Sequence, residues 1–148
     1  MPGADDEYST AVLDASVAVR WLVNERGSDQ AAALLGRRIS WVAPRLILTE
    51  VGGALRRKVS GAELEPDAAV ERLDALLSFI DGVTIRLIDD ERIVSSALRL
   101  SLSLGHNVAD CLYLALAERD GVALYTADVA LARIAIERGV AAQLLPSS

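Results

Sequence analysis

Short apolar runs alternate with longer amphipathic segments along most of the chain. The runs lack polar alternation, which is typical of strands that are buried on both faces of a sheet. We predict strands at residues 11–14, 39–43, 83–88, 122–125 and 141–145. The segments between them place apolar residues at helical spacing. We predict helices at residues 17–24, 28–38, 44–60, 66–80, 90–104, 107–120 and 128–138.

Proline and glycine mark several ends of these helices. Pro44 and Pro66 stand where a first helical residue tolerates the missing N–H, and Gly105 and Gly121 directly follow predicted helices. Strands and helices alternate along the whole chain, so the strands can pair in parallel, with helices covering both faces. The sequence therefore predicts an α/β fold, a three-layer α/β/α sandwich with a central, mainly parallel sheet.

Composition limits the class of protein. The chain has 148 residues, 52% of them hydrophobic, which is enough for one packed core. We expect a single domain at residues 11–148 after an acidic N-terminal tail at residues 1–10. One cysteine allows no internal disulfide, and no uncharged apolar run has the ~18 residues that a membrane helix needs. We expect a cytoplasmic protein without a membrane partner.

The charge balance disfavours non-specific binding to nucleic acid. Fifteen basic residues against 21 acidic ones give a net charge of −6. A polyanionic partner would therefore need a local feature that offsets this repulsion.

Two acidic residues follow predicted strands. Asp14 ends the first strand, and Asp128 comes three residues after the strand at 122–125. The carboxyl ends of parallel strands share one edge of a sheet, where open α/β sheets bind ligands. We expect these two carboxylates to lie at that edge.

Two further acidic residues occupy positions that should be apolar. Glu50 falls between Ile47 and Val51 on the apolar stripe of its helix, and a carboxylate buried there needs a partner. Asp110 begins a helix so apolar that we expect it to be buried nearly all round. Asp110 could also stabilise its helix N-terminus behind the Asn107 cap, and Asp128 could be an N-cap.

Four converging carboxylates would repel one another and raise each other's pKa. A hard divalent cation, Mg²⁺ or Mn²⁺, relieves this repulsion because it prefers oxygen ligands. One histidine and one cysteine give no support for zinc. Such a cation can activate water against a phosphodiester bond, so the pattern favours a metal-dependent nuclease.

At these acids the sequence resembles the PIN-domain endoribonucleases, in particular the small VapC-type toxins of bacterial toxin–antitoxin pairs. The matching stretches are residues 12–16, 48–55, 108–117 and 124–128. The resemblance implies that Asp14, Glu50, Asp110 and Asp128 form an acidic quartet that binds Mg²⁺ or Mn²⁺ and carries catalysis. It implies that Ser16 and Thr126 support these ligands through hydrogen bonds. It also implies an RNA substrate, a cognate antitoxin protein that neutralises the chain, and a homodimer.

Two other functions fit parts of the pattern. A catalytically inactive PIN-like domain could serve as a binding or scaffold module, with its acids only capping helices. A phosphoryl-transfer domain could use Asp14 as the phosphate acceptor, but such sites use a second nearby aspartate and a lysine. Ser16 replaces the former, and we expect Lys58, the sole lysine, to lie beyond the reach of the site.

Two further features of the sequence allow more than one interpretation. His106 lies four residues before Asp110 and could reach the site, although a loop histidine is more often a surface or capping residue. Gly52 and Gly53 interrupt a predicted helix, which suggests that another backbone approaches there, either in packing against the sheet or in a dimer or antitoxin contact.

Overall fold

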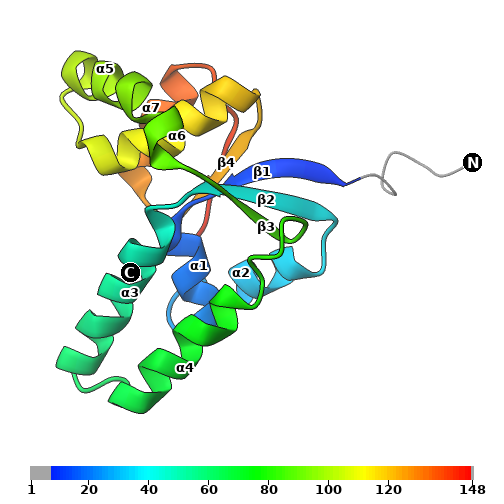
Figure 1. The fold of residues 1–148 in the computed structure, drawn as a ribbon, viewed down its shortest axis with the longest axis vertical. Helices are drawn as coiled ribbons and strands as arrows, with labels where there is room; N and C mark the ends of the chain where they lie inside the picture. The colour runs from blue at the N-terminus through cyan, green and yellow to red at the C-terminus, as the bar shows by residue number, and fades with distance from the viewer. Residues whose placement is uncertain (1–7, 148) are drawn as a thin grey trace, which may run out of the picture.

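One parallel sheet forms the centre of the computed structural model, which describes residues 8–147 (Figure 1). Its strands in that range are β1 (Ser9–Leu13), β2 (Ile39–Pro44), β3 (Ile85–Ile88), β4 (Ala123–Thr126) and β5 (Ala142–Leu144). They lie in the order β3-β2-β1-β4-β5, and every neighbouring pair is parallel. The central strands are apolar because helices cover both faces.

Helices pack on both faces of this sheet. They are α1 (Ala15–Leu22), α2 (Ser28–Leu35), α3 (Ile47–Ser60), α4 (Pro66–Leu77), α5 (Val94–Leu104), α6 (Val108–Asp120) and α7 (Val129–Glu137). Helices α1 to α4 pack together on one side and α5 to α7 on the other (Figure 1). The three-layer α/β/α sandwich predicted from the sequence is confirmed. No helix within residues 8–147 is long and apolar enough to cross a membrane.

Helix α6 is the most deeply buried helix of its layer. Its residues 111–117 are all buried, as the apolar sequence predicted, and the helix contacts β1, β2 and β4. It ends at Gly121, which adopts a left-handed conformation with φ of 64°. The first turn of α6 is thereby fixed next to the carboxyl ends of the central strands.

Some boundaries differ from the prediction. Pro44 does not open α3: it ends β2, opposite Ile88 of β3, and the helix begins at Ile47. Proline is tolerated at this strand end because the next residue, Arg45, supplies the N–H that donates to the Ile88 carbonyl. The predicted helix at 90–104 begins with a 3₁₀ turn, Asp90–Arg92, and the one at 66–80 ends at Leu77.

The first strand also begins earlier than expected. Ser9 and Thr10 pair with Ile39 and Ser40 of β2, so they belong to the sheet rather than to a tail. The rest of the predicted acidic tail, residues 1–7, lies outside the described residues.

The strand order creates a crevice at the carboxyl edge of the sheet. From β1 the chain continues outward through β2 and β3, and it returns on the other side of β1 to form β4 and β5. The order therefore reverses between β1 and β4, and the helices that follow these two strands lie on opposite faces. Ligands of open α/β sheets bind at such a switch point.

Candidate functional site

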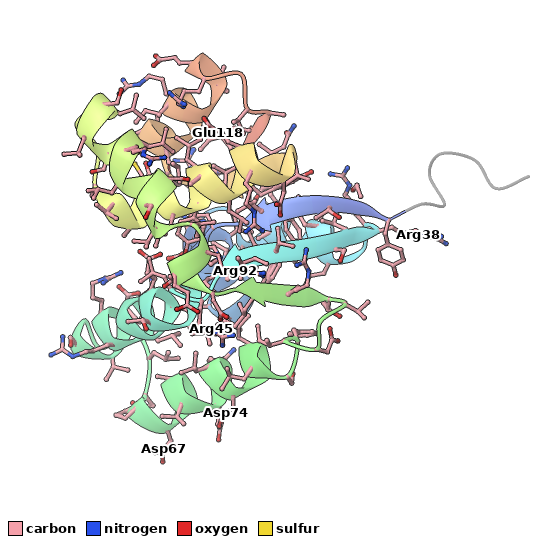
Figure 2. The ribbon with its side chains drawn as sticks, turned by 45° about the horizontal axis from the view of Figure 1, so that its top comes forward. Arg38, Arg45, Asp67, Asp74, Arg92 and Glu118 are labelled. Atoms are coloured by element: carbon pink, nitrogen blue, oxygen red, sulfur yellow. The ribbon has the colours of Figure 1, made fainter. Side chains whose placement is uncertain are left out.

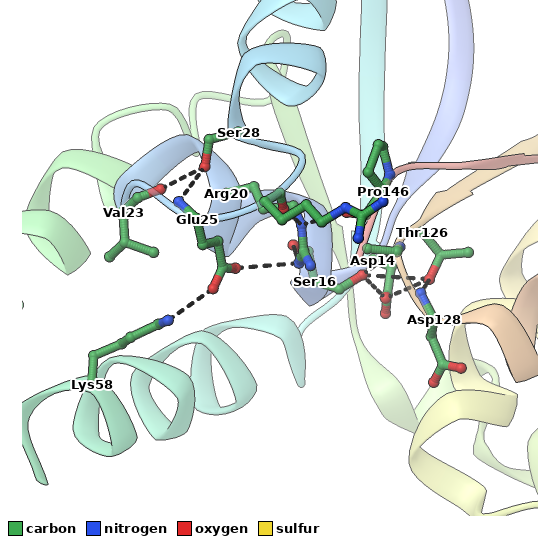
Figure 3. A network of polar contacts seen from close by, with 12 residues as sticks. Asp14, Ser16, Arg20, Val23, Glu25, Ser28, Lys58, Thr126, Asp128 and Pro146 are labelled. Atoms are coloured by element: carbon green, nitrogen blue, oxygen red, sulfur yellow. Dashed lines mark hydrogen bonds and ion pairs between the residues drawn. The ribbon is translucent and has the colours of Figure 1, made fainter. Parts of the chain in front are cut away.

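Asp14 lies at the bottom of this crevice, directly after β1. Its N–H continues the sheet by donating to the Tyr125 carbonyl at 3.1 Å, and the residue is only 6% exposed. Its Oδ2 accepts hydrogen bonds from the Ser16 hydroxyl and, at 2.8 Å, from Thr126 Oγ1 (Figure 3). Burial raises the pKa of Asp14 to about 6, although these two hydrogen bonds oppose the shift.

Ser16 and Thr126 connect Asp14 to the loop after β4. Thr126 Oγ1 accepts from the Asp128 N–H at 3.0 Å, and Ser16 Oγ accepts from the Ala127 N–H at 2.9 Å. Each hydroxyl thus donates to Asp14 and accepts from the neighbouring loop. These hydrogen bonds hold the Asp14 carboxylate against the loop after β4.

Asp128 is the N-cap of α7. Its Oδ1 accepts from the N–H groups of Ala130 and Leu131, at 2.9 and 3.2 Å. The capping interpretation is therefore geometrically correct. Asp128 also lines the cavity at Asp14.

Glu50 reaches the cavity from α3. It is half-buried rather than buried, because it lies at the edge of the stripe formed by Ile47, Val51 and Leu55. Its Oε1 accepts a 2.6 Å hydrogen bond from the hydroxyl of Tyr113, a buried residue of α6. Burial raises the pKa of Glu50, and the Tyr113 hydrogen bond opposes that shift.

The sequence reasoning missed Tyr113. Its only signal was one hydroxyl in an otherwise apolar segment, three residues after Asp110. Buried tyrosine hydroxyls need a partner, and here the partner comes from a helix on the opposite face of the sheet.

Asp110 lies in the first turn of α6. Its N–H donates to Oδ1 of the N-cap Asn107 at 2.8 Å, and its Oδ2 accepts from Asn107 Nδ2 at 3.0 Å. The same Oδ2 lies 2.8 Å from His106 Nε2. His106 therefore does reach the candidate site, where it contacts a carboxylate instead of the solvent alone.

The four predicted carboxylates line one cavity of about 540 Å³. In each of them a single oxygen takes all the hydrogen bonds that residues 8–147 donate to the side chain. The other oxygens accept none of those bonds: Asp14 Oδ1, Glu50 Oε2, Asp110 Oδ1 and Asp128 Oδ2. The negative charges of Asp110 and Glu50 also contribute to the raised pKa of Asp14. Each of the four carboxylates is thus held by one oxygen, and Asp14 is close enough to Asp110 and Glu50 for their charges to raise its pKa.

The donor set fits a hard cation. Carboxylate oxygens are the ligands that Mg²⁺ and Mn²⁺ prefer. Cys111 is buried in the core, at 1% exposure, so a soft thiolate ligand is not offered to the cavity. As they stand, no three Asp, Glu, His or Cys side chains of the described range approach closely enough to hold a metal ion. The acids share a cavity without forming a closed cluster.

Basic residues line the other end of the same cavity: Arg20, Arg57 and Lys58. The Glu25 carboxylate bridges two of them, 3.3 Å from Arg20 Nη1 and 2.9 Å from Lys58 Nζ (Figure 3). Lys58 Nζ also lies 3.0 Å from Glu63 Oε2.

The expectation that Lys58 lies beyond the reach of the site is wrong. Helix α3 continues to Ser60, and Lys58 follows Glu50 by eight residues, which places both on one face of the helix. Phosphoryl transfer gains little from this position, because the ammonium group is already paired with Glu25 and Glu63.

Comparison with known proteins agrees with this architecture. The family model described as PIN domain matches residues 11–137. Ribonuclease VapC1 of Mycobacterium tuberculosis is 36% identical over 123 residues, which cover 82% of this chain and 87% of that protein.

Two solved structures share the fold. PAE2754 from Pyrobaculum aerophilum has a TM-score of 0.64 at 21% identity, over 86% of both chains. VapBC2 from Rickettsia felis, bound to a DNA fragment from its promoter, has a TM-score of 0.63 at 14% identity, over 93% of this chain and 99% of that one. The family match spans most of the sequence, from β1 to α7. The chain belongs to the PIN domain family.

Proposed function

We propose that this protein is a metal-dependent endoribonuclease that acts as the toxin of a toxin–antitoxin pair. The observation that carries the proposal is the cavity at the switch point of the sheet. Four carboxylates from separate segments line it, and each presents one oxygen without a hydrogen bond from residues 8–147. The relative named Ribonuclease VapC1 supports ribonuclease activity as the chemistry.

Asp14, Glu50, Asp110 and Asp128 would hold Mg²⁺ or Mn²⁺. When bound, the cation would lower the pKa of its water, offset the carboxylate charge and stabilise the leaving oxygen of a phosphodiester. The protein's part is to orient the ligands. Ser16 and Thr126 fix Asp14 through Oδ2, which leaves Oδ1 for the cavity.

The other ligands have similar supports. Tyr113 fixes Glu50 through Oε1, and Asn107 and His106 fix Asp110 through Oδ2. Such hydrogen bonds restrict the rotamers of carboxylate ligands, so less order has to be gained when a ligand binds.

We also propose a cognate antitoxin that neutralises the chain by covering this cavity. Solved structures of the same fold include a toxin–antitoxin complex from Klebsiella pneumoniae and VapBC-5 from Mycobacterium tuberculosis. A protein that covers the cavity would prevent RNA from reaching the carboxylates.

RNA cleavage by the purified protein tests the proposal. We expect cleavage with Mg²⁺ or Mn²⁺, none with a chelator, and none after Asp110→Asn, which keeps the size of the side chain and removes its charge. Asp74→Asn on the outer face of α4 is the matched control and should cleave like the wild type (Figure 2). Metal-independent cleavage, or an active Asp110→Asn variant, would contradict the proposal.

An inactive scaffold is the second candidate. The observation in its favour is that Asp128 caps α7 and that the Asp110 carboxylate accepts a hydrogen bond from Asn107, the N-cap of α6, so each has a structural use. Thermal melting separates the two candidates, because a cation bound only by the folded state raises the melting temperature. The absence of any shift at millimolar Mg²⁺ and Mn²⁺ would favour the scaffold.

A further inference from the structure

Arg57 differs from the other cations of the candidate cavity. Arg20 and Lys58 are paired with Glu25, and Lys58 also with Glu63 (Figure 3). Arg57 lines the same cavity and is exposed, and no residue in the range 8–147 forms a hydrogen bond or ion pair with its guanidinium. Its charge is therefore available to an incoming anion.

The guanidinium of Arg57 points back toward the acidic end. Arg57 follows Glu50 by seven residues on α3, about 10 Å along the helix axis. Its Nη1 lies 3.7 Å from the position that a β-carbon on Gly53 would occupy, so the side chain extends one turn toward Glu50. In agreement with this placement, the charge of Arg57 lowers the pKa of Glu50, against the larger effect of burial.

Gly52 and Gly53 separate Glu50 from Arg57 on α3 and carry no side chain. The sequence suggested that another backbone approaches Gly52 and Gly53, and for a backbone of this chain's own sheet this is wrong. A β-carbon at Gly52 would meet no atom within 4 Å, and one at Gly53 would meet only the Arg57 guanidinium. Within the described residues, Arg57 is therefore the one side chain that lies over the backbone of Gly53, between Glu50 and the next turn of α3.

We propose that Arg57 binds an RNA phosphate adjacent to the one that is cleaved, and that the RNA strand crosses α3 at Gly53. This inference rests on the proposed ribonuclease function. A guanidinium binds phosphate through two parallel N–H donors, so it can fix the strand as well as attract it. Six carboxylates line the cavity, and Arg57 is the cation there that pairs with none of them within the described chain.

RNA binding at several salt concentrations tests the proposal. The comparison is between Arg57→Gln and Arg56→Gln, both made in the Asp110→Asn protein so that the RNA stays intact. Arg56 is the matched control, because it is the neighbouring exposed arginine, turned about 100° around the helix, and does not line the cavity. The probe is a short fluorescein-labelled single-stranded RNA, and the readout is fluorescence anisotropy in the presence of Mg²⁺.

We expect Arg57→Gln to weaken binding about tenfold and to reduce the slope of log K against log salt by about 0.7, as for one lost phosphate contact on a single strand. Arg56→Gln should change neither quantity. Arg57→Lys should keep the slope, because it keeps the charge, and should recover only part of the affinity. Equal affinities and slopes for Arg57→Gln and Arg56→Gln would overturn the proposal.

Kinetics with an intact quartet separate this inference from the proposed function. Arg57→Gln should raise KM while kcat changes little, because the contact lies beside the reacting bond. Metal-dependent cleavage with unchanged KM in Arg57→Gln would refute the inference alone. Cleavage that survives Asp110→Asn would refute the proposed function. If Arg57→Gln binds RNA as before but binds an antitoxin more weakly, the partner of Arg57 is a carboxylate of that protein, and the proposal is overturned.

Discussion

Replacing Asp14 by asparagine should stabilise the metal-free protein at neutral pH. The carboxylate is 6% exposed, and burial raises its pKa from 3.8 to about 6. A shift of about two pKa units corresponds to ~3 kcal/mol of stability that is lost when the buried group ionises. Asparagine can still accept the hydrogen bonds of Ser16 and Thr126 through its amide oxygen. Burial of the amide N–H groups offsets part of the gain, so we expect about 1–3 kcal/mol.

The pH dependence gives the sign. Because the folded-state pKa is raised, the folded protein binds more protons than the unfolded chain between about pH 4 and pH 6. The contribution of Asp14 to the free energy of unfolding is therefore highest below about pH 4, where Asp14 is protonated in both states, and this contribution is lost as the pH rises through about 6. Asp14→Asn removes this loss, so its advantage over the wild type should be small near pH 4 and full near pH 8.

Urea unfolding in a chelating buffer at these two pH values measures the effect. Asp74→Asn is the control, because Asp74 points outward from α4 and its replacement should leave stability unchanged at both pH values (Figure 2). With Mg²⁺ added, the stability advantage of Asp14→Asn over the wild type should shrink, because binding of the cation stabilises only the wild type. An Asp14→Asn protein that is less stable than the wild type near pH 8, by the same amount as near pH 4, would refute the argument from burial.

Three other substitutions, in or near the candidate site, test the remaining structural arguments. Tyr113→Phe removes the hydrogen bond to Glu50, so urea unfolding should show a loss of about 1–2 kcal/mol and calorimetry a weaker affinity for Mg²⁺; unchanged values would make this bond incidental. Gly52→Ala should stabilise α3 by about 0.5–1 kcal/mol in urea unfolding, because its β-carbon meets no atom within 4 Å, and a loss would indicate a clash. Asp128→Asn should keep the N-cap and the stability, whereas Asp128→Ala should lose about 1 kcal/mol in urea unfolding. Both variants should lose affinity for Mg²⁺ in calorimetry if Asp128 binds the cation. Unchanged affinity in both variants would show that Asp128 is only a cap.

Local patterns were sufficient to predict the layers of the fold. Buried parallel strands appear as apolar runs, and helix ends appear as proline or glycine, so every element was found near its place. Pro44 shows where this logic fails. Its preference for a first helical turn is local, but the ladder between β2 and β3 extends to it through Ile88, which lies 44 residues later. Pairing over that distance leaves no mark in the local pattern.

The candidate site was predictable only in part, for the same physical reason. Asp14 and Asp110 stood out because a charge next to an apolar strand or helix is costly without a partner. The partners did not stand out. Tyr113 looks like a core residue until its hydroxyl meets Glu50 from another layer, and Glu25 looks like a loop residue until it bridges Arg20 and Lys58.

Capping and ligand binding were alternatives in the sequence, but in the structure they are compatible. A carboxylate has two oxygens, and a cap uses one of them. Asp128 caps α7 through Oδ1, and Asp110 contacts Asn107 and His106 through Oδ2. These hydrogen bonds therefore fix the plane of each carboxylate and orient its remaining oxygen. An aspartate that is hydrogen-bonded through one oxygen at this edge of the sheet is thus already in a fixed orientation, as a metal ligand must be. Its structural role is therefore compatible with a catalytic role.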